Sequence, residues 1–298
     1  MEKLTFTVPP EFDGHTVYDF LRREKGVSSR LIKRLKRMEP PGGLFRNGQP
    51  VRTIDPIRTG DQLLLRWREQ ERCPAASSLT VQVLFEDGSL IVFNKPWDMP
   101  CHPSKRHQTD TLGNVFAARC AADGQVLPFR PVNRLDKDTT GIVVVAKNQY
   151  AASRLAGRIE KEYLAILCGN PQPPAGIIDE PIDRVDPVHI LRQVSPDGQR
   201  AVTHYTVLAR TQDYSLARFW LETGRTHQIR VHMSHIGHPL AGDVWYGGDT
   251  RIIEKQALHC AVCHFVHPVL EKRIKISAPL HEPFKKALNN ACISVNFE

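Results

Sequence analysis

The sequence contains no long hydrophobic run. Its longest apolar stretches have the length of a single strand, whereas a helix that crosses a bilayer needs about 20 consecutive apolar residues. The N-terminal segment MEKLTFTVPPEFDGH also lacks the apolar core of a signal peptide. We therefore expect a cytoplasmic protein that does not enter a membrane.

Cysteines are few and odd in number. The 298-residue chain has seven, scattered between Cys73 and Cys292. A disulfide framework is typical of small secreted domains with paired cysteines, so we expect free thiols in a reducing compartment. The sequence shows no internal repeat and no low-complexity tract. With 41% hydrophobic and 24% charged residues, its composition is that of a globular protein and excludes a disordered or fibrous one.

Acidic residues are outnumbered by basic ones. The chain has 40 Lys and Arg against 32 Asp and Glu, a net charge of +8. Residues 1–70 hold 14 of the basic and 9 of the acidic residues, so the excess is concentrated there. This balance favours a polyanionic partner such as nucleic acid, although basic proteins of other classes share it.

Residues 27–38, VSSRLIKRLKRM, have the pattern of a short amphipathic helix that Ser28 or Ser29 can cap. One stripe at helical spacing is apolar: Leu31, Leu35 and Met38. A second stripe is basic: Arg30, Lys33, Arg34 and Arg37. Four aligned cations can contact a row of RNA phosphates, and the alternative is a solvated charged face.

The next segment, residues 43–67, has the pattern of short strands joined by turns at Asn47-Gly48 and Thr59-Gly60-Asp61. Together with the basic helix it resembles the S-four-like RNA-binding module, over about residues 14–68. We predict this domain over residues 1–70, a linker over 71–79 and a second domain over 80–298.

Five motifs follow one another in the second part of the chain: NKPWDMPCHPS, NRLDKDTTGIVVVAKN, KEYLAILCG, LETGRTHQIRVHMSHIGHPLAGDVWYG and LHCAVCHFVHP. Their succession, over about residues 80–282, resembles the RluA-type family of RNA pseudouridine synthases. Five ordered matches are far more specific than any single motif. The resemblance identifies the second domain, residues 80–298, as catalytic.

The resemblance also implies a fold and an activity. The fold is α/β (α+β), with a catalytic domain built on a mixed, largely antiparallel sheet that carries an active-site cleft, after a small α+β S-four-like module. The activity is isomerisation of specific uridines to pseudouridine in structured RNA, ribosomal or transfer RNA, with the target base flipped out. The resemblance implies no metal, no cofactor and no obligate protein partner.

Asp136 stands in the most characteristic motif, and the resemblance implies that it is the catalytic nucleophile. A carboxylate can attack the ribose carbon or stabilise positive charge on it while the detached uracil stays in the pocket. The alternative is that Asp136 and Asp138 are solvated turn residues. The family usually has His where this chain has Asn133, which leaves the geometry of the loop open.

Two further residues complete the catalytic set that the resemblance implies. Tyr163 lies against the uracil and is the candidate base for the proton lost during isomerisation, and a buried structural tyrosine is the alternative. Alternation along the strand places Tyr163 on the same face as Lys161. Arg230 pairs with the nucleophilic Asp136, because an adjacent cation favours the charged form of a desolvated carboxylate.

Other basic residues are candidates for RNA contacts. Arg134 would occupy the space that the flipped nucleotide vacates, or it is a surface phosphate contact. Arg225 and His227 are substrate or scaffold contacts, at the start of a helix that Thr226 could cap. The remaining candidates are Lys95, Lys161 and the four cations of the basic stripe, Arg30, Lys33, Arg34 and Arg37.

The segment HCAVCH has the spacing of a zinc site. The surrounding pattern indicates a strand, however, and residues three apart on a strand, such as Cys260 and Cys263, point to opposite faces. We therefore expect no metal there.

Two other function classes stay open. The chain can be an RNA-binding or ribosome-assembly factor without chemistry, although its retention of Asp136, Tyr163 and Arg230 argues against this. It can also be a glycosidase that uses Asp136 and Asp138, but such pairs need a separation of about 5 to 9.5 Å that sequence spacing cannot establish. Product analysis separates the three classes.

Overall fold

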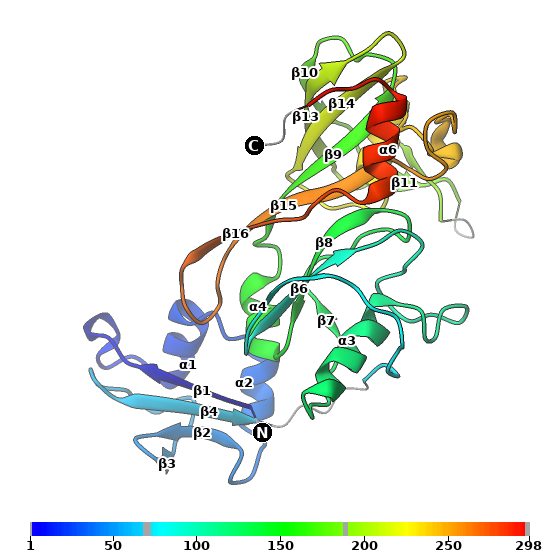
Figure 1. Ribbon diagram of the computed structural model, residues 1–298. Helices are drawn as coiled ribbons and strands as arrows, with labels where there is room; N and C mark the ends of the chain where they lie inside the picture. Colours follow the sequence, from blue (N-terminus) through cyan, green and yellow to red (C-terminus); the bar gives the residue numbers. More distant parts are fainter. Residues whose placement is uncertain (1, 68–72, 187–189, 296–298) are drawn as a thin grey trace.

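The fold is described from a computed structural model that covers residues 2–67, 73–186 and 190–295. Figure 1 shows an elongated molecule with the N-terminal elements at one end and strands β10, β13 and β14 at the other. These three strands belong to a large sheet that extends from the middle of the molecule to this second end, which confirms the predicted mixed α/β fold with a mostly antiparallel sheet.

Residues 2–67 form a four-stranded antiparallel sheet with helical segments on it. Its strands, in spatial order, are β1 (Glu2–Thr7), β4 (Gln62–Trp67), β2 (Gly43–Arg46) and β3 (Gln49–Pro50). The helical segments are η1 (Pro10–Phe12), α1 (Val17–Asp19), η2 (Phe20–Glu24) and α2 (Ser29–Leu35). This unit has its own apolar core, centred on Phe20, Leu31 and Trp67.

Helix α2 is the predicted basic helix. Ser28 caps it, since its hydroxyl accepts a hydrogen bond of 3.2 Å from the backbone N–H of Leu31. Leu31 and Leu35 are buried as the spacing predicts, while the helix ends at Leu35 and leaves Met38 half-buried beyond it.

The predicted linker falls only partly within the described residues, because residues 71 and 72 lie outside them. Residues 73–79 contain no helix or strand. They lie against helix α3 (Leu112–Ala122), where the side chain of Asn114 donates a 2.8 Å hydrogen bond to the backbone of Ala75. The division into two domains stays a prediction.

The large sheet has the strand order β10-β13-β14-β9-β15-β8-β6-β5, with β16 also paired to β15 and β7 to β8. The first half comprises β10 (Ala175–Asp179), β13 (Val202–Arg210), β14 (Tyr214–Leu221), β9 (Glu160–Cys168), β15 (Leu258–Val266) and β16 (Arg273–Ser277). The second half comprises β8 (Thr140–Ala146), β7 (Arg130–Pro131), β6 (Leu90–Lys95) and β5 (Val83–Glu86). A separate short ribbon pairs β11 (Ile182–Arg184) with β12 (Arg192–Val194).

The two halves meet where β8 pairs with β15, and this is the one parallel pair among the described strands. Gly141 lies opposite Cys260 there, with φ of +105°. A side chain at this position would collide with the backbone of Cys260, so the close approach of the strands requires glycine. The junction fixes the loop that precedes β8.

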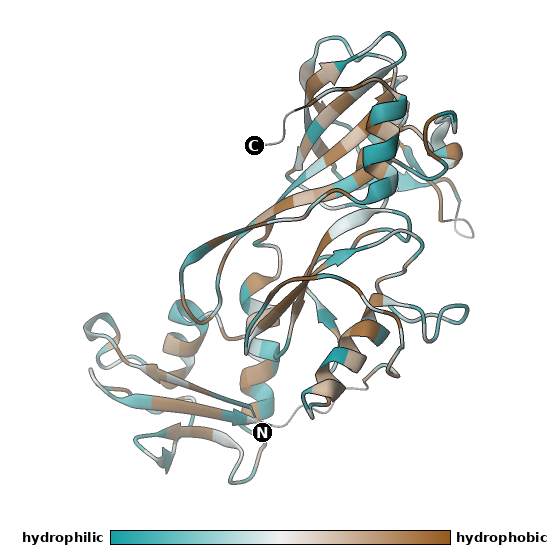
Figure 2. Cartoon of the chain, viewed as in Figure 1, coloured by the Kyte–Doolittle hydropathy of each residue, from teal (hydrophilic) through white to brown (hydrophobic). Residues whose placement is uncertain are grey.

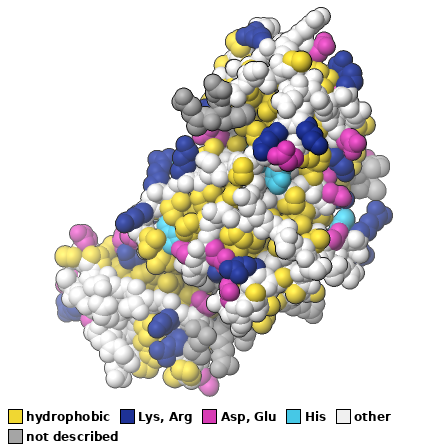
Figure 3. Space-filling view, in the orientation of Figure 1, with side chains coloured by type: hydrophobic (Ala, Val, Ile, Leu, Met, Phe, Trp, Pro, Cys, Tyr) yellow, Lys and Arg dark blue, Asp and Glu magenta, His cyan; other side chains and the backbone are white. Residues whose placement is uncertain are grey.

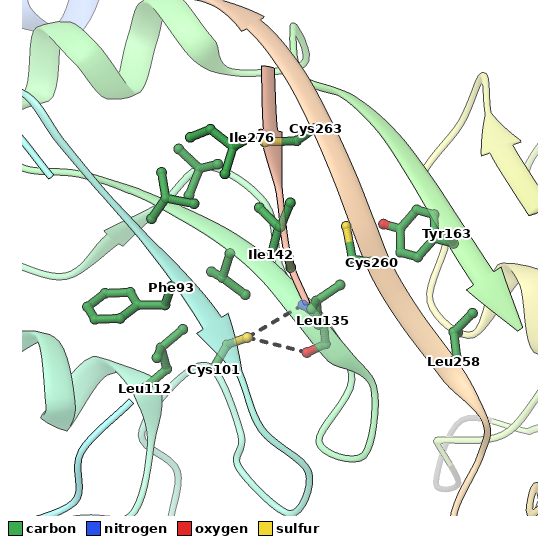
Figure 4. Close-up of a cluster of buried hydrophobic side chains, with 14 of the residues drawn as sticks. Phe93, Cys101, Leu112, Leu135, Ile142, Tyr163, Leu258, Cys260, Cys263 and Ile276 are labelled. Atoms are coloured by element: carbon green, nitrogen blue, oxygen red, sulfur yellow. Dashed lines mark hydrogen bonds between the residues drawn. The ribbon is translucent and has the colours of Figure 1, made fainter. Parts of the chain in front are cut away.

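Strand β8 is buried along its whole length, in agreement with the valine-rich core strand that its sequence predicts. Its core also contains Phe93 of β6, Tyr163 of β9 and Cys260 of β15 (Figure 4). Helix α6 (Glu282–Asn290) covers a second core on the other face of β9 and β14, and it turns mostly hydrophilic residues outward (Figure 2).

The segment HCAVCH lies in strand β15, as predicted, but the prediction that Cys260 and Cys263 point to opposite faces is wrong. A bulge between Cys260 and Val262 shifts the register of β15 against β9. One extra residue reverses the alternation that follows it. Both Cys260 and Cys263 are therefore buried in the same core (Figure 4).

Helices α4 and α5 pack against different parts of the molecule. Tyr150 of α4 (Gln149–Leu155) packs into the core of the N-terminal unit, with its ring centroid 5.6 Å from that of Phe6. Helix α5 (Gln228–His235) packs against β12 and β13. Among the described helices, none is long and apolar enough to span a membrane.

Candidate active site

Asp136 lies in the loop between β7 and β8, and its neighbour Asn133 fixes this loop to the core strand. The Asn133 amide donates 2.9 Å to the carbonyl of Ile142 and accepts 2.8 Å from the N–H of Val144. Leu135 is also buried, and Cys101 Sγ lies 3.4 Å from its carbonyl oxygen (Figure 4). Both ends of the Asn133 amide therefore fix the loop to strand β8.

Lys95 also fixes this loop, through hydrogen bonds from its buried ammonium group. Its ammonium donates to the carbonyls of Pro96, Met99 and Lys137 at 2.9, 2.9 and 2.8 Å. Burial lowers the pKa of Lys95 to about 8. Since the side chain is fully buried and all three donors are used within the protein, the expectation that Lys95 contacts RNA was wrong. Its position instead ties the loop of residues 96–99 to the Asp136 loop.

The carboxylate of Asp136 faces one group from helix α5 and one from the residue that precedes it. Its Oδ2 lies 3.4 Å from Nη1 of Arg230 and 3.8 Å from Nε2 of His227. Asp138, in contrast, lies 3.5 Å from Nζ of Lys255. The two carboxylates thus have different partners, and only Asp136 lines the pocket described below.

Arg230 has a closer partner than Asp136. Its Nε and Nη2 donate to the two carboxylate oxygens of Asp243 at 2.6 and 2.8 Å, and both side chains are almost completely buried. Burial lowers the pKa of Arg230, but the hydrogen bonds and charge of Asp243 outweigh this and raise it above the ordinary value. Asp243 was not among the predicted site residues, although it lies in the fourth motif, in GDVWYG.

His227 occupies the first position before α5, where the sequence predicted Thr226. Its backbone has φ of +59°, in the left-handed region that residues other than glycine adopt rarely. Its Nδ1 lies 2.8 Å from the hydroxyl of Tyr246, which also accepts a 3.0 Å hydrogen bond from the N–H of Arg192. Burial lowers the pKa of His227 to about 4, so the ring is neutral near pH 7.

A small pocket of about 70 Å³ opens beside Asp136. Its apolar wall comprises Tyr163, Leu221, Ile229 and Leu258. Arg134 and Arg225 are exposed and line the same pocket, so these two predicted RNA contacts lie next to Asp136. A larger cavity of about 720 Å³ lies beside α6, but Asp136 and Arg230 do not line it. The convergence of charged groups therefore marks the smaller pocket as the site.

Tyr163 lies on β9, with Ala165 and Leu167 on the same face, as alternation predicts. It is 7% exposed, and its hydroxyl points toward the sulfur of Cys260 (Figure 4). Burial raises the pKa of Tyr163 well above the ordinary value, so the phenol is neutral near pH 7. Lys161 is half-buried on the same strand and does not line the pocket.

The four cations predicted on α2 and just after it lie together. Arg30, Lys33, Arg34 and Arg37 line one groove with Met38, at the N-terminal end of the molecule. Three of them are exposed, whereas Arg34 is half-buried and donates a 3.4 Å hydrogen bond to Gln149.

The zinc-like segment is engaged in other contacts. His259 is buried, with Nδ1 2.8 Å from the Thr140 hydroxyl and Nε2 3.3 Å from the carbonyl of Ala278. His264 lies 3.7 Å from Glu162. No cluster of three or more His, Cys, Asp or Glu side chains suited to a metal ion occurs within residues 2–67, 73–186 and 190–295.

Known proteins match this chain in sequence. The family model described as RNA pseudouridylate synthase matches residues 89–235. The "Uncharacterized RNA pseudouridine synthase YjbO" of Bacillus subtilis (strain 168) is 36% identical over 89% of this chain and 95% of its own length. The "Ribosomal large subunit pseudouridine synthase D" of Vibrio cholerae is 39% identical over 71% of each chain.

The chain belongs to the RluA-type family of RNA pseudouridine synthases.

The fold agrees with this assignment. The solved structure "Human RNA Pseudouridylate Synthase Domain Containing 4" has a TM-score of 0.59 and 26% identity, and the match covers 72% of this chain and 94% of that one. This pseudouridine synthase is therefore an isomerase that converts uridine to pseudouridine in RNA. The family and enzyme class predicted from the five motifs are confirmed.

The ion pair of Arg230 with Asp243 predicts a specific loss of stability. Arg230→Ala leaves a buried Asp243 carboxylate without its partner, and we expect a loss of about 3–5 kcal/mol in the free energy of unfolding. Adding Asp243→Asn removes the unpaired charge and should recover more than half of this loss, but no activity. Denaturant unfolding and an isomerisation assay measure the two effects.

The matched control for this pair is Arg218→Ala. Arg218 is an exposed arginine, 3.8 Å from Glu162, and its loss should change the free energy of unfolding by no more than about 1 kcal/mol. If Arg230→Ala is as stable as Arg218→Ala, the buried pair does not support the fold as we describe.

Proposed function

We propose that this enzyme isomerises specific uridines in structured RNA, ribosomal or transfer RNA, with Asp136 as nucleophile and the target base flipped into the pocket beside it. The observation that carries the proposal is the Asp136 carboxylate, 22% exposed at the mouth of the pocket and 3.4 Å from the nearly buried Arg230. An ionised carboxylate next to a fixed cation is suited to attack on the ribose carbon 1.

The proposed reaction moves electrons without net gain or loss of atoms. Asp136 bonds to ribose carbon 1 as the bond to uracil nitrogen 1 breaks, and the electron pair of that bond stays on uracil. The base turns in the pocket, and carbon 5 displaces the carboxylate from the sugar. The carboxylate that this displacement frees accepts the proton from carbon 5, and one proton passes on to nitrogen 1, so that Asp136 ends the cycle as a carboxylate.

Asp136 is also the acceptor we propose for the proton on carbon 5. Displacement from the sugar frees the carboxylate at the position where the proton must leave. Tyr163, the base predicted from the sequence, can accept a proton only as a phenolate, and its burial and raised pKa disfavour that form. We therefore assign Tyr163 to the wall against which the uracil packs, as a neutral phenol.

Opening of the RNA requires an exposed group at the edge of the pocket. Extraction of a base from its stack costs a few kcal/mol. Arg134 is exposed and adjacent to Asp136 in the loop, so its guanidinium can fill the vacated space and neutralise nearby phosphate. Arg225, which also lines the pocket, provides a second phosphate contact.

The N-terminal unit provides a third contact surface in this proposal. The groove of Arg30, Lys33, Arg34 and Arg37 brings four cations together. Over the face drawn in Figure 3 as a whole, cations and acidic side chains are interspersed. We propose that residues 1–70 act as an S-four-like RNA-binding domain through this groove. The name of the Vibrio cholerae relative supports large-subunit ribosomal RNA as the first target to test. The cytoplasmic location stays a prediction.

The Asp136→Asn variant tests the nucleophile. It keeps the shape of the side chain but removes its charge and nucleophilicity, so the rate should fall by on the order of 10³-fold or more. Tritium release from large-subunit ribosomal RNA transcribed with uridine labelled at carbon 5 measures the rate. Unfolding temperature and RNA affinity should stay close to those of wild type.

Asp138→Asn is the control, because Asp138 contacts Lys255 and does not line the pocket. It should be at least tenfold more active than Asp136→Asn. The nucleophile assignment fails if Asp136→Asn retains activity within tenfold of wild type. Release of free uracil in place of pseudouridine would instead favour a glycosidase.

The Tyr163 assignment is tested by comparing Tyr163→Phe with Tyr163→Ala. A neutral wall needs the ring and not the hydroxyl, so the Phe variant should keep at least about one tenth of the activity, and the Ala variant much less. A wild-type rate that climbs with pH up to pH 10, together with an inactive Phe variant, would show that the phenolate is the base.

The basic groove is tested by the salt dependence of RNA affinity. Replacing the three exposed cations, Arg30, Lys33 and Arg37, by alanine should make the slope of log affinity against log salt shallower by about 2, because each phosphate contact contributes about 0.7–0.9. The control replaces Arg52 and Arg58, which already pair with Asp55 and Asp13. Equal slopes in the two variants would exclude the groove as an RNA contact.

A further inference from the structure

Trp245 is exposed at an unusual place. It lies in the short helix η3 (Val244–Tyr246), immediately after Asp243, and 56% of its surface is accessible to solvent. The neighbouring Val244 is 65% exposed. Tryptophan is on average highly buried in folded proteins, so a large exposed indole beside a catalytic pocket requires an explanation.

One side of this indole contacts Arg230 and His227, the two groups that face Asp136. The guanidinium of Arg230 lies 5.5 Å from the Trp245 ring centroid, and the His227 ring lies 6.0 Å away. These contacts leave the remaining surface of the ring open to solvent. Trp245 therefore lies directly at the cation that contacts Asp136, at the edge of the site.

The segment that carries Trp245 is held firmly. The carbonyl of Tyr246 accepts a 2.7 Å hydrogen bond from the Ser234 hydroxyl, and the Tyr246 hydroxyl contacts His227 at 2.8 Å. The backbone N–H of Tyr246 donates to Asp243 at 3.0 Å. An aromatic side chain on a fixed backbone loses little conformational entropy when it packs against a ligand.

The charges around this ring favour a nucleic acid over a protein. Arg134 and Arg225 line the pocket, and Arg192 and Arg134 both lie near enough to His227 to help lower its pKa. The nearby carboxylates, Asp136 and Asp243, are already paired with Arg230. Exposed aromatic side chains among cations are the combination that binds single-stranded nucleic acid, by stacking on bases while the cations contact phosphates.

We propose that Trp245 is a stacking platform for an unpaired nucleobase of the RNA substrate, next to the uridine that enters the pocket. The inference rests on the proposed function in so far as Asp136 marks where the target uridine binds. Stacking recognises the π-face that every base presents and not its hydrogen-bonding edge. The platform therefore strengthens binding of unpaired RNA without selecting its sequence.

Trp220 provides a matched comparison within the chain. It is 43% exposed, but its ring is stacked on His204, with the centroids 5.0 Å apart and the planes at 12°. It alternates with Leu221, which lines the pocket, so it lies on the other face of the sheet. An exposed tryptophan away from the pocket should not affect RNA binding.

Fluorescence anisotropy with a fluorescein-labelled ten-nucleotide oligouridine tests the platform. All proteins carry Asp136→Asn, so that no turnover occurs. Trp245→Ala should weaken binding about tenfold, which corresponds to ~1.4 kcal/mol. Trp245→Phe should recover most of the affinity, and Trp220→Ala should stay within about twofold of the parent. A labelled abasic oligomer of the same length should bind equally to the parent and Trp245→Ala, because it has phosphates but no bases.

Three results would overturn the proposal. Unchanged affinity of Trp245→Ala for oligouridine removes the platform. An equal loss for the abasic oligomer shows that the variant perturbs phosphate contacts or the fold. Unchanged RNA affinity with an altered oligomeric state shows that the indole contacts protein. Because the assay measures binding without chemistry, it remains readable if Asp136 is not the nucleophile, and that failure appears only in the tritium assay.

Discussion

The buried ion pair between Arg230 and Asp243 is the interaction on which the site depends. A guanidinium with almost no access to water needs a carboxylate to offset the loss of hydration, and Asp243 supplies one in bidentate geometry. The remaining guanidinium nitrogen, Nη1, lies 3.4 Å from the carboxylate of Asp136. One cation thus joins three chain segments, namely the loop before β8, helix α5 and the turn that leads to η3.

The loop that carries Asp136 is fixed from its own side by a second set of contacts. Asn133 bonds to strand β8 with both ends of its amide, and Lys95 bonds to the carbonyl of Lys137. Strand β8 is itself held in the middle of the sheet by its parallel pairing with β15 at Gly141. The nucleophile that we propose must be held within a fraction of an ångström of its productive position, and buried hydrogen bonds on a central strand provide that rigidity.

The pocket is lined by apolar groups from the core and by charged groups at its edge. Tyr163 and Leu258 present an apolar wall from the core, which suits the face of a base, while Arg134 and Arg225 remain exposed at its edge. His227 is neutral near pH 7 because burial lowers its pKa to about 4. Of the two groups that face Asp136, His227 and Arg230, only Arg230 therefore carries a positive charge. The cations of the N-terminal unit lie in a separate groove. Tyr150 packs into the core of this unit and so joins it to the rest of the protein.

Local patterns in the sequence determined much of this description. The valine run predicts a buried strand, the helical spacing around Ser28 predicts a capped helix with cations in one groove, and five ordered motifs identify the family. Tertiary contacts decided the rest. Whether Lys95 meets solvent, which carboxylate Arg230 holds and how far burial raises the pKa of Tyr163 depend on segments far apart in the chain. The bulge in β15 likewise follows from pairing with β9, and it places Cys260 and Cys263 on the same side. Periodicity reports only how neighbouring residues are oriented, whereas burial and charge pairing are set by what the fold brings next to them.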